Sequence, residues 1–261
     1  MTIRTFSLFL LLTVLGLLLS VAPLYSQQNE ALQDSLNRAS ELFRTGEEQE
    51  GLDLYLKILE DYPTNLEALW NTTVIYARIG HRADTENRKR NNFEKAMDYA
   101  QRALEHHPES GYAHYAMAVA KGRMTEVLDT GDSIENSNDM KDHLQEAADK
   151  LPDFAPLWHL YGVWHSDVAN VSGIGRAAAG LFGEGLPDAS NEKAEEYLKR
   201  AISLDSDNIL FRMDLARHYR DTDQQEEAVD TLQELLKLEP RMQGDERMLN
   251  QAKEMLQDFS Q

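Results

Sequence analysis

The feature that most constrains this fold is a recurring short amphipathic helix that ends at or near a proline. Five segments follow the pattern, with small residues along one face, and in the fourth of them Ser206 takes the place of the proline: EGLDLYLKILEDYPTN (50–65), EKAMDYAQRALEHHPES (94–110), HLQEAADKLPDF (143–154), EKAEEYLKRAISLDSDN (192–208) and EEAVDTLQELLKLEPRM (226–242). Segments with aromatic and small residues alternate with them, for example LEALWNTTVIYARIG and APLWHLYGVWHSDVAN. A single helix pair of this kind cannot bury its apolar face, whereas a row of pairs can. The pattern therefore predicts stacked helical hairpins.

One stretch carries the clearest hairpin motif. Trp158 is followed by Tyr161 and Gly162, which resembles the Trp-x2-Leu-Gly pattern in the first helix of a tetratricopeptide repeat. The next amphipathic helix has the small–large–small pattern of the second helix: Ala194, Leu198 and Ala201. The resemblance implies that small residues let the paired helices approach closely, while bulky residues fill the space between them.

The distances between helix ends predict where the repeat is interrupted. From Ser206 to Pro240 the spacing is 34 residues, which matches the usual unit of about 34. The spacings from Pro63 to Pro108, on to Pro152, and on to Ser206 are 45, 44 and 54 residues. Roughly 10, 10 and 20 residues are therefore inserted between the two helices of units two, three and four.

We therefore predict an all-α fold, a tetratricopeptide-like helical-hairpin solenoid wound as a right-handed superhelix with inserts in its middle units. The solenoid is expected to span residues 27–261, and a helix over 244–259 is expected to cap its C-terminal end. Its five predicted units are 31–65, 66–110, 111–154, 155–208 and 209–242.

The first 26 residues are expected to direct export. Arg4 precedes the apolar run FSLFLLLTVLGLLLSVAPLY, which is typical of a secretory signal peptide with cleavage near Ser26. The run from Phe6 to Tyr25 is also about long enough to span a bilayer, so an uncleaved anchor is the alternative. In either case we expect the folded part outside the cytoplasm, periplasmic or secreted. The absence of cysteine excludes disulfides and favours a bacterial periplasm.

The charge of the chain limits its partners. The formal net charge is −19, and such a surface repels nucleic acid and anionic membranes. We therefore expect a protein or peptide partner, no nucleic acid, and no membrane contact beyond an uncleaved anchor. One segment, RIGHRADTENRKR (78–90), concentrates basic residues. It is either a solvated helical extension with internal ion pairs or a docking site for an acidic partner.

The insert of unit four indicates which family of helical-repeat proteins the chain resembles. The stretch WHLYGVWHSDVANVSGIGRAAAGLFGEGLPDASNEKAEEYLKR resembles the hallmark segment of the regulator of microtubule dynamics family, whose members are tetratricopeptide-like proteins. The matching residues are Gly162, Trp164, Ala169, Arg176, Ala178, Leu181, Phe182, Pro187, Ala194 and Tyr197. The resemblance covers about residues 66–241. Eukaryotic members are implied to associate with microtubules or to tether organelles. For an exported acidic chain, the resemblance implies a scaffold that binds proteins, but it does not identify the partner.

The inner face of such a solenoid, formed by one side of each first helix, is the expected binding surface. That face holds three residues from each of units two to five: Trp70, Val74 and Arg78; Tyr115, Val119 and Arg123; His159, Val163 and Asp167; Met213, Arg217 and Arg220. Aromatic residues beside arginines are good anchors for a peptide with carboxylate groups. The alternative is that Trp70 and Tyr115 only fill the space between helices.

The glycine-rich stretch SGIGRAAAGLFGEG (172–185) imitates a phosphate-binding loop. A helix rather than a buried strand is expected before it, and no Lys-Ser/Thr follows, so nucleotide binding is not expected. The stretch is predicted to form a short amphipathic helix, with Phe182 packed against the solenoid or free for a partner. Arg176, Leu181 and Phe182 are the candidate functional residues of this insert.

The expected function is a non-catalytic protein–protein interaction scaffold that binds a peptide or helix in its concave groove. His159 and His165 are six positions apart, which turns them to different faces of a helix and predicts no metal site. Without cysteine or a Gly-x-Ser-x-Gly elbow, nucleophilic catalysis has no support, and no cofactor is expected. Two alternatives remain: a small-ligand binder or enzyme with a pocket beside the insert 172–186, and a scaffold that self-assembles through that insert. Partner, pathway and oligomeric state stay open.

Overall fold

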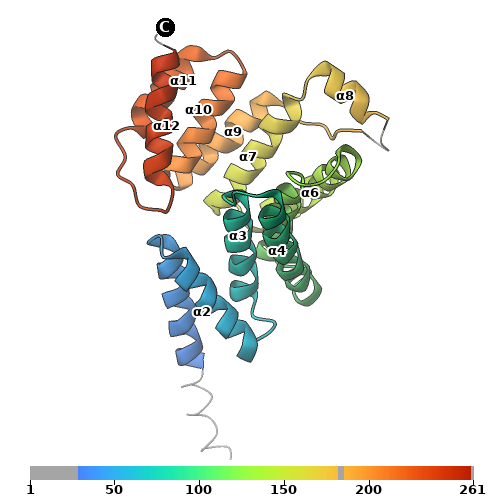
Figure 1. Ribbon diagram of the computed structural model, residues 1–261, viewed down its shortest axis with the longest axis vertical. Coiled ribbons are helices and arrows are strands. Elements are labelled where there is room, and N and C mark those ends of the chain that lie inside the picture. The colour runs from blue at the N-terminus through green and yellow to red at the C-terminus, as the bar shows by residue number, and fades with distance from the viewer. Residues whose placement is uncertain (1–28, 182–184, 260–261) are drawn as a thin grey trace, which may run out of the picture.

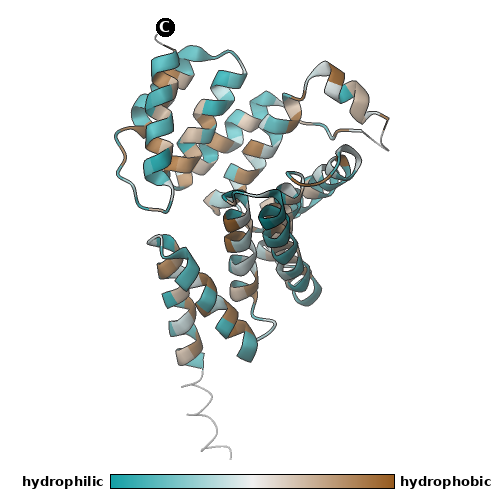
Figure 2. Ribbon diagram, in the orientation of Figure 1, coloured by the Kyte–Doolittle hydropathy of each residue, from teal (hydrophilic) through white to brown (hydrophobic). Residues whose placement is uncertain are grey.

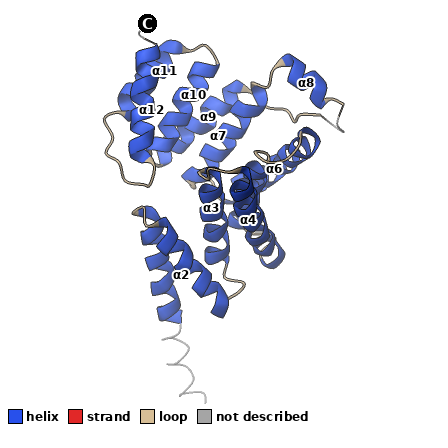
Figure 3. Cartoon of the chain, in the orientation of Figure 1, coloured by secondary structure: helices blue, strands red, loops and turns tan. Residues whose placement is uncertain are grey.

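Every regular element in the described part of the chain is a helix. The computed structural model describes residues 29–181 and 185–259 (Figures 1 and 3). A first helix, whose described part covers 29–44, precedes α2 (Glu48–Asp61), α3 (Leu66–His81), α4 (Glu86–His106), α5 (Gly111–Met124), α6 (Thr130–Lys150), α7 (Ala155–Ala169), α8 (Gly173–Ala179), α9 (Asn191–Leu204), α10 (Ile209–Asp221), α11 (Gln225–Leu235) and α12 (Asp245–Asp258). The expected signal peptide, 1–26, lies outside the described residues.

Neighbouring helices pair as hairpins that stack in chain order (Figure 1). The pairs are the first helix with α2, α3 with α4, α5 with α6, α7 with α9, and α10 with α11. The last helix, α12, packs against both α10 and α11 and covers the C-terminal end of the stack. Apolar residues gather on the helix sides that face one another, while hydrophilic residues face outward (Figure 2). The predicted helical-hairpin solenoid with a capping helix is confirmed.

Short polar side chains determine where several helices begin. The Asn65 side chain accepts a hydrogen bond from the Ala68 amide at 2.9 Å and caps α3. Thr85, Ser190 and Asn208 cap α4, α9 and α10 in the same way. Each such cap stabilises a helix start by about 1 kcal/mol, because it satisfies an amide that no helical carbonyl can reach. The local sequence therefore sets these helix boundaries.

Helices approach one another closely at Gly162, where α7 meets α9 within a hairpin. A β-carbon at this position would lie 2.7 Å from Leu198 Cγ and 2.9 Å from the Leu198 backbone nitrogen. Ala194 and Ala201, which flank Leu198 on α9, are fully buried. The small residues predicted from the repeat motif therefore let the two helices pack at close range.

The three inserts differ in form. In units two and three the second helix is longer, because α4 and α6 each span 21 residues whereas α2 and α9 each span 14. The added residues extend an existing helix by about two turns. In unit four the insert forms α8 and the segment leading to α9, and it projects from the side of the solenoid (Figure 1).

The first and last parts of the solenoid meet. The turn after the first helix holds Gly46 at a φ of 88°, and a β-carbon on Gly46 would lie 3.5 Å from the backbone nitrogen of Gln243 and 3.8 Å from its Cβ. We call Gly46 against Gln243 the closure contact. The Asp245 carboxylate supports the loop that carries Gln243, accepting from the amides of Arg241 at 2.8 Å and Met242 at 2.7 Å. The row of hairpins therefore curls back on itself (Figure 1).

Candidate protein-binding groove

The twelve residues predicted for the inner face lie on α3, α5, α7 and α10, the first helices of units two to five. Tyr115 and Met213 are buried, Asp167 and Arg220 are exposed, and the other eight are half-buried. Ion pairs, hydrogen bonds and charge interactions connect these residues from one unit to the next. We call the surface predicted for these twelve residues the groove.

Units one and two are joined through a buried carboxylate. Arg78 donates from Nε to Glu48 Oε1 at 2.8 Å, and Arg82 also pairs with Glu48, which is only 4% exposed. The Arg78 guanidinium lies over the Phe43 ring as well, 5.3 Å from its centroid. Removing one partner of a buried ion pair leaves an uncompensated charge and is strongly destabilising. Arg78 is therefore a bridge between units as well as a groove residue.

Units two and three share a second cluster, centred on Glu126. Its carboxylate accepts from Arg123 at 2.7 Å, contacts His81 Nδ1 at 2.9 Å, and lies 3.5 Å from Lys89 Nζ. Burial alone would raise the pKa of Glu126, but the hydrogen bonds from His81 and Arg123 outweigh burial and bring that pKa down to about 2. Glu126 is therefore held ionised by cations from both units.

The other basic residues of segment 78–90 also have partners within the protein. Arg88 pairs with Asp84 at 3.1 Å, and Arg90 pairs with Glu86 at 3.7 Å. Arg90 also donates to the Val127 carbonyl of the next unit. The segment has the internal ion pairs of a solvated helical extension, and its cations are not a free basic patch.

Units four and five are joined by a histidine–aspartate contact. His159 Nε2 lies 2.8 Å from Asp214 Oδ2, and the His159 ring stacks on Phe211 with 4.6 Å between centroids. Asp214 also accepts from Arg217 at 2.7 Å, and Arg217 reaches Gln251 of α12 at 3.1 Å. Burial raises the pKa of Asp214, but the hydrogen bond and charge of His159 and the charge of Arg217 outweigh burial, so the pKa lies below its ordinary value. A polar chain thus links unit four to the cap.

Asp167 is the groove residue whose charge is least favourable. Its carboxylate has no hydrogen bond or ion pair with the residues that the structure describes. The residue is exposed at the surface, but enough protein lies near its carboxylate to weaken its hydration. This burial, and then the negative charges of Asp214 and Asp221, raise the pKa of Asp167 to about 6 against the opposing charge of Arg123. Carboxylates perturbed in this way cluster at functional sites.

Trp70 and Tyr115 belong to an aromatic cluster between units two and three. Trp70 stacks on Tyr112 with 5.4 Å between centroids, and Phe154 meets Tyr115 edge to face at 5.1 Å. Burial raises the pKa of Tyr115, which is only 6% exposed. The Tyr115 ring therefore fills space between helices, while Trp70 stays half-buried at the surface.

At its C-terminal end the groove contains a cavity of about 310 Å³ between α10 and α12. Three of its lining residues were predicted from the sequence: Met213, Arg217 and Arg220. The other five come from the cap and the residue after it: Gln251, Glu254, Met255, Asp258 and Phe259. The cap therefore closes the stack and also supplies part of the groove wall, which sequence reasoning missed.

Sequence reasoning also missed the two groove carboxylates Glu48 and Glu126. A signal existed for Glu126, because it lies three positions after Arg123, a spacing at which helical ion pairs form. No local signal links Glu48 to Arg78, since the two residues are 30 positions apart and meet only when two units stack.

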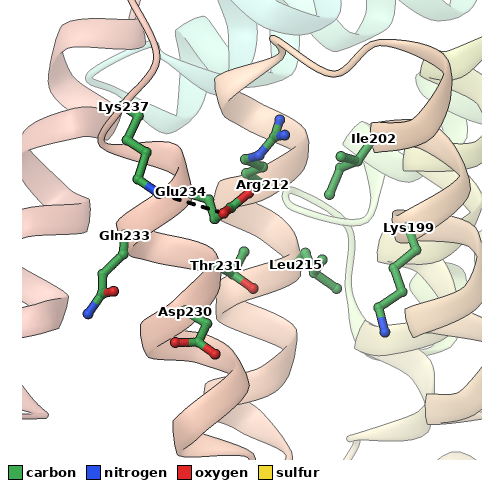
Figure 4. Close-up of a pocket in the computed structure, with 9 residues that line it drawn as sticks. All are labelled: Lys199, Ile202, Arg212, Leu215, Asp230, Thr231, Gln233, Glu234 and Lys237. Atoms are coloured by element: carbon green, nitrogen blue, oxygen red, sulfur yellow. Dashed lines mark ion pairs between the residues drawn. The ribbon is translucent and has the colours of Figure 1, made fainter.

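A larger cavity, of about 520 Å³, lies among α9, α10 and α11 (Figure 4). Its lining mixes both charges with a few apolar side chains: Lys199, Ile202, Arg212, Leu215, Asp230, Thr231, Gln233, Glu234 and Lys237. Glu234 and Lys237 pair at 3.7 Å (Figure 4). Neither this cavity nor the smaller one is lined by residues of the insert 172–186. The alternative of a ligand pocket beside that insert therefore finds no support in these two cavities.

The candidate insert residues are not part of the groove. Arg176 on α8 donates to the Val168 carbonyl at 2.7 Å, and Leu181 is exposed. Phe182 lies outside the described residues, so its predicted position is not tested.

Histidines give no metal centre in the part of the chain that the structure describes. No group of three or more His, Asp or Glu side chains there could hold a metal ion. His165 is buried among aromatic rings, and burial lowers its pKa to about 4. Over the same residues, no helix combines the length and apolar character needed to cross a bilayer.

Comparison with known proteins agrees with this architecture. The sequence pattern described as "Regulator of microtubule dynamics protein 1-3" matches residues 35–260. Regulator of microtubule dynamics protein 1 of Bos taurus is 25% identical over 234 residues, which cover 88% of this chain and 72% of the relative. The Caenorhabditis elegans protein of that name is 25% identical over 227 residues, 86% of this chain and 99% of the relative.

Among solved structures, a thermophilic TPR protein of Thermus thermophilus superimposes with a TM-score of 0.63 at 19% sequence identity. The superposition covers 87% of this chain and 99% of the Thermus protein, and it shows the tetratricopeptide fold alone. The family match shows more than the fold, because a sequence pattern specific to one family matches residues 35–260, well over half of the chain. The chain belongs to the regulator of microtubule dynamics protein 1–3 family, as the unit-four insert predicts.

Proposed function

We propose that this protein is a non-catalytic scaffold whose groove binds a peptide or helix of another protein outside the cytoplasm. Tetratricopeptide-type solenoids commonly bind protein or peptide partners through the inner face of the stack. The observation that supports the proposal most is Asp167, an unpaired carboxylate among the described residues whose pKa is raised to about 6. A basic group on the partner would add to the partial compensation that the charge of Arg123 provides.

The remaining groove charges would select a partner more than they would strengthen its binding. Arg78, Arg123 and Arg217 already pair with carboxylates of the protein, so an acidic group on the partner must exchange with an existing ion pair. Such exchange sets orientation and specificity, and its net effect on affinity is small. Apolar contact area would come from Trp70 and Val74, which are half-buried beside the charged positions.

The test uses peptides selected from a random peptide library on the wild-type protein. Their affinities are then measured for Arg123→Glu and Asp167→Lys. Arg123 is suitable because its side chain is 39% exposed, whereas changing Arg78 would disturb the buried Glu48. We expect each groove variant to lose at least about tenfold in affinity, which corresponds to about 1.4 kcal/mol.

The matched controls are Lys57→Glu and Arg247→Glu, at exposed positions on α2 and α12 that have no ion pair with the described residues. These controls change the net charge as Arg123→Glu does, and we expect them to bind as the wild type does. Equal binding by groove and control variants would contradict the proposal.

The proposed location needs its own test. Residues 1–40 would be fused to a phosphatase reporter that is active only outside the bacterial cytoplasm. Activity with this segment, and its loss when Leu10 and Leu11 are replaced by arginine, is the expected result, because charges in the apolar run abolish a signal peptide. An inactive fusion would contradict export.

A further inference from the structure

Helix α8 presents its apolar stripe to solvent. Ile174 is 85% exposed and Leu181, just after the helix, is 83% exposed; Ala177 and Ala178 between them are exposed too. The spacing i, i+3, i+4 and i+7 places these four side chains on one side. Ala179, on another side, is only 1% exposed. The other helices of the stack bury their apolar stripes against neighbouring helices, whereas the apolar stripe of α8 faces solvent.

Hydrogen bonds hold the start of the stripe to α7 and, beyond the stripe, Gly185 to α6. Arg176 donates to the Val168 carbonyl of α7 at 2.7 Å, and Ser172 Oγ accepts from the Gly175 amide at 3.1 Å. Near the end of the insert, Asn138 of α6 donates to the Gly185 carbonyl at 2.9 Å. A surface that is already ordered loses little conformational freedom when a partner binds.

Helix α6, which packs against α8, carries exposed acidic side chains. Asp129 and Asp132 lie at its start, and Glu135 lies about one turn before Asn138, which anchors Gly185; we call these three residues the acidic rim. Residues 172–181 contain no acidic residue, and their one charged side chain, Arg176, is bonded to α7. The result is an apolar centre with a negative rim, which is the usual anatomy of a docking surface.

We propose that this stripe docks an amphipathic helix of another protein, one whose apolar face is flanked by lysine or arginine. Two apolar stripes of similar width pack ridge into groove, and the basic flanks would face the acidic rim. A second copy fits less well, because a symmetric contact through α8 would bring two acidic rims together. An anionic bilayer is disfavoured by the net charge of −19.

The contact would be weak and reversible. Helix α8 has seven residues, so at about 1.5 Å per residue it is only about 10 Å long. Interfaces much smaller than about 1,200 Å² in total belong to transient encounters. The stripe would therefore add a second, low-affinity contact to the main groove, and it involves none of the groove residues.

The test uses two synthetic fluorescent helices of about 18 residues, with leucines along one face and either lysines or glutamates on its flanks. Anisotropy is measured at about 0.15 M salt. We expect the lysine peptide to bind and the glutamate peptide not to bind. Ile174→Asp should weaken binding of the lysine peptide at least about tenfold, although the variant adds negative charge.

Asn250→Asp, at an exposed position of α12, adds the same charge and should leave that affinity unchanged. Equal effects of the two variants, or tighter binding by Ile174→Asp, would show non-specific attraction and overturn the proposal. So would a dimer in sedimentation, or flotation with phosphatidylcholine vesicles, that Ile174→Asp abolishes. Should that variant lose its helical circular dichroism, Leu181→Gln is measured instead with the same expectations.

Discussion

The closure contact can be tested by a disulfide, because the chain contains no cysteine of its own. In the double variant Gly46→Cys/Gln243→Cys, the two β-carbons would lie 3.8 Å apart. Disulfides need a Cβ–Cβ distance of about 3.5–4.5 Å, so the bond can form without moving the backbone far. We expect a single intramolecular disulfide when the purified variant is oxidised.

The expected stabilisation follows from the length of chain that the disulfide closes. For a loop of about 200 residues, the lost entropy of the unfolded chain corresponds to about 5 kcal/mol. Gly46 has a φ of 88°, which a cysteine adopts only with strain, of order 1–2 kcal/mol. The strain is present in both redox states, so urea unfolding of the oxidised and reduced variant should differ by close to the full entropic term.

The assay compares this variant with Gly173→Cys/Gln243→Cys at low protein concentration. Gly173 lies on α8, and a β-carbon there would meet nothing within 4 Å. Alkylation and mass spectrometry count the free thiols after oxidation. Fast disulfide formation in the first variant alone is the expected result. Equal rates in the two variants, or no stabilisation on oxidation, would refute the closure contact.

Three further predictions concern single residues. Gly162→Ala should destabilise the protein by about 3 kcal/mol in urea unfolding, because two backbone atoms of α9 would lie within 3.1 Å of the added carbon. The control variant Gly173→Ala should change stability by less than about 1 kcal/mol. Asp167→Asn should stabilise the protein at pH 7 by about 1 kcal/mol. This is about one third of the free energy that corresponds to the rise in the Asp167 pKa from 3.8 to about 6, because exposure to solvent weakens the effect. In the wild type this group makes stability fall as the pH rises from about 4 to 6, and the variant should lack that fall in thermal melts. Glu126 acts in the opposite direction, because its ionised carboxylate stabilises the fold. This contribution to stability is complete above pH 4.5 and is lost as the pH falls toward the Glu126 pKa of about 2. Glu126→Gln should therefore make the melting temperature fall less steeply at acid pH.

The hairpins could be predicted from the sequence because their signals are local. Helical periodicity, caps such as Asn65, and the Gly162–Ala194 pairing lie within single units, and each unit repeats them. The insert lengths could be predicted by counting residues, but their form could not. Extra residues at the start of α4 and α6 simply lengthen those helices, because their composition allows helix to continue.

The groove could be predicted only in part, because its remaining features depend on how units stack. Glu48 meets Arg78 across 30 positions, and Gly46 meets Gln243 only after small rotations add up over the whole solenoid. The orientation of α8 could not be predicted either. Its alanines favour a helix, but nothing in the sequence indicates that Ile174 faces solvent. Such features arise from tertiary packing rather than from local propensity.

Hydrogen exchange is the measurement that tests the groove most directly. Exchange of backbone amides would be followed by mass spectrometry with and without a library-selected peptide at saturating concentration. We predict slower exchange in α3, α5, α7 and α10, with little change in α9 and α11 around the cavity of about 520 Å³. Protection confined to α9 and α11, or protection in the groove helices that persists undiminished in Arg123→Glu and Asp167→Lys, would contradict it.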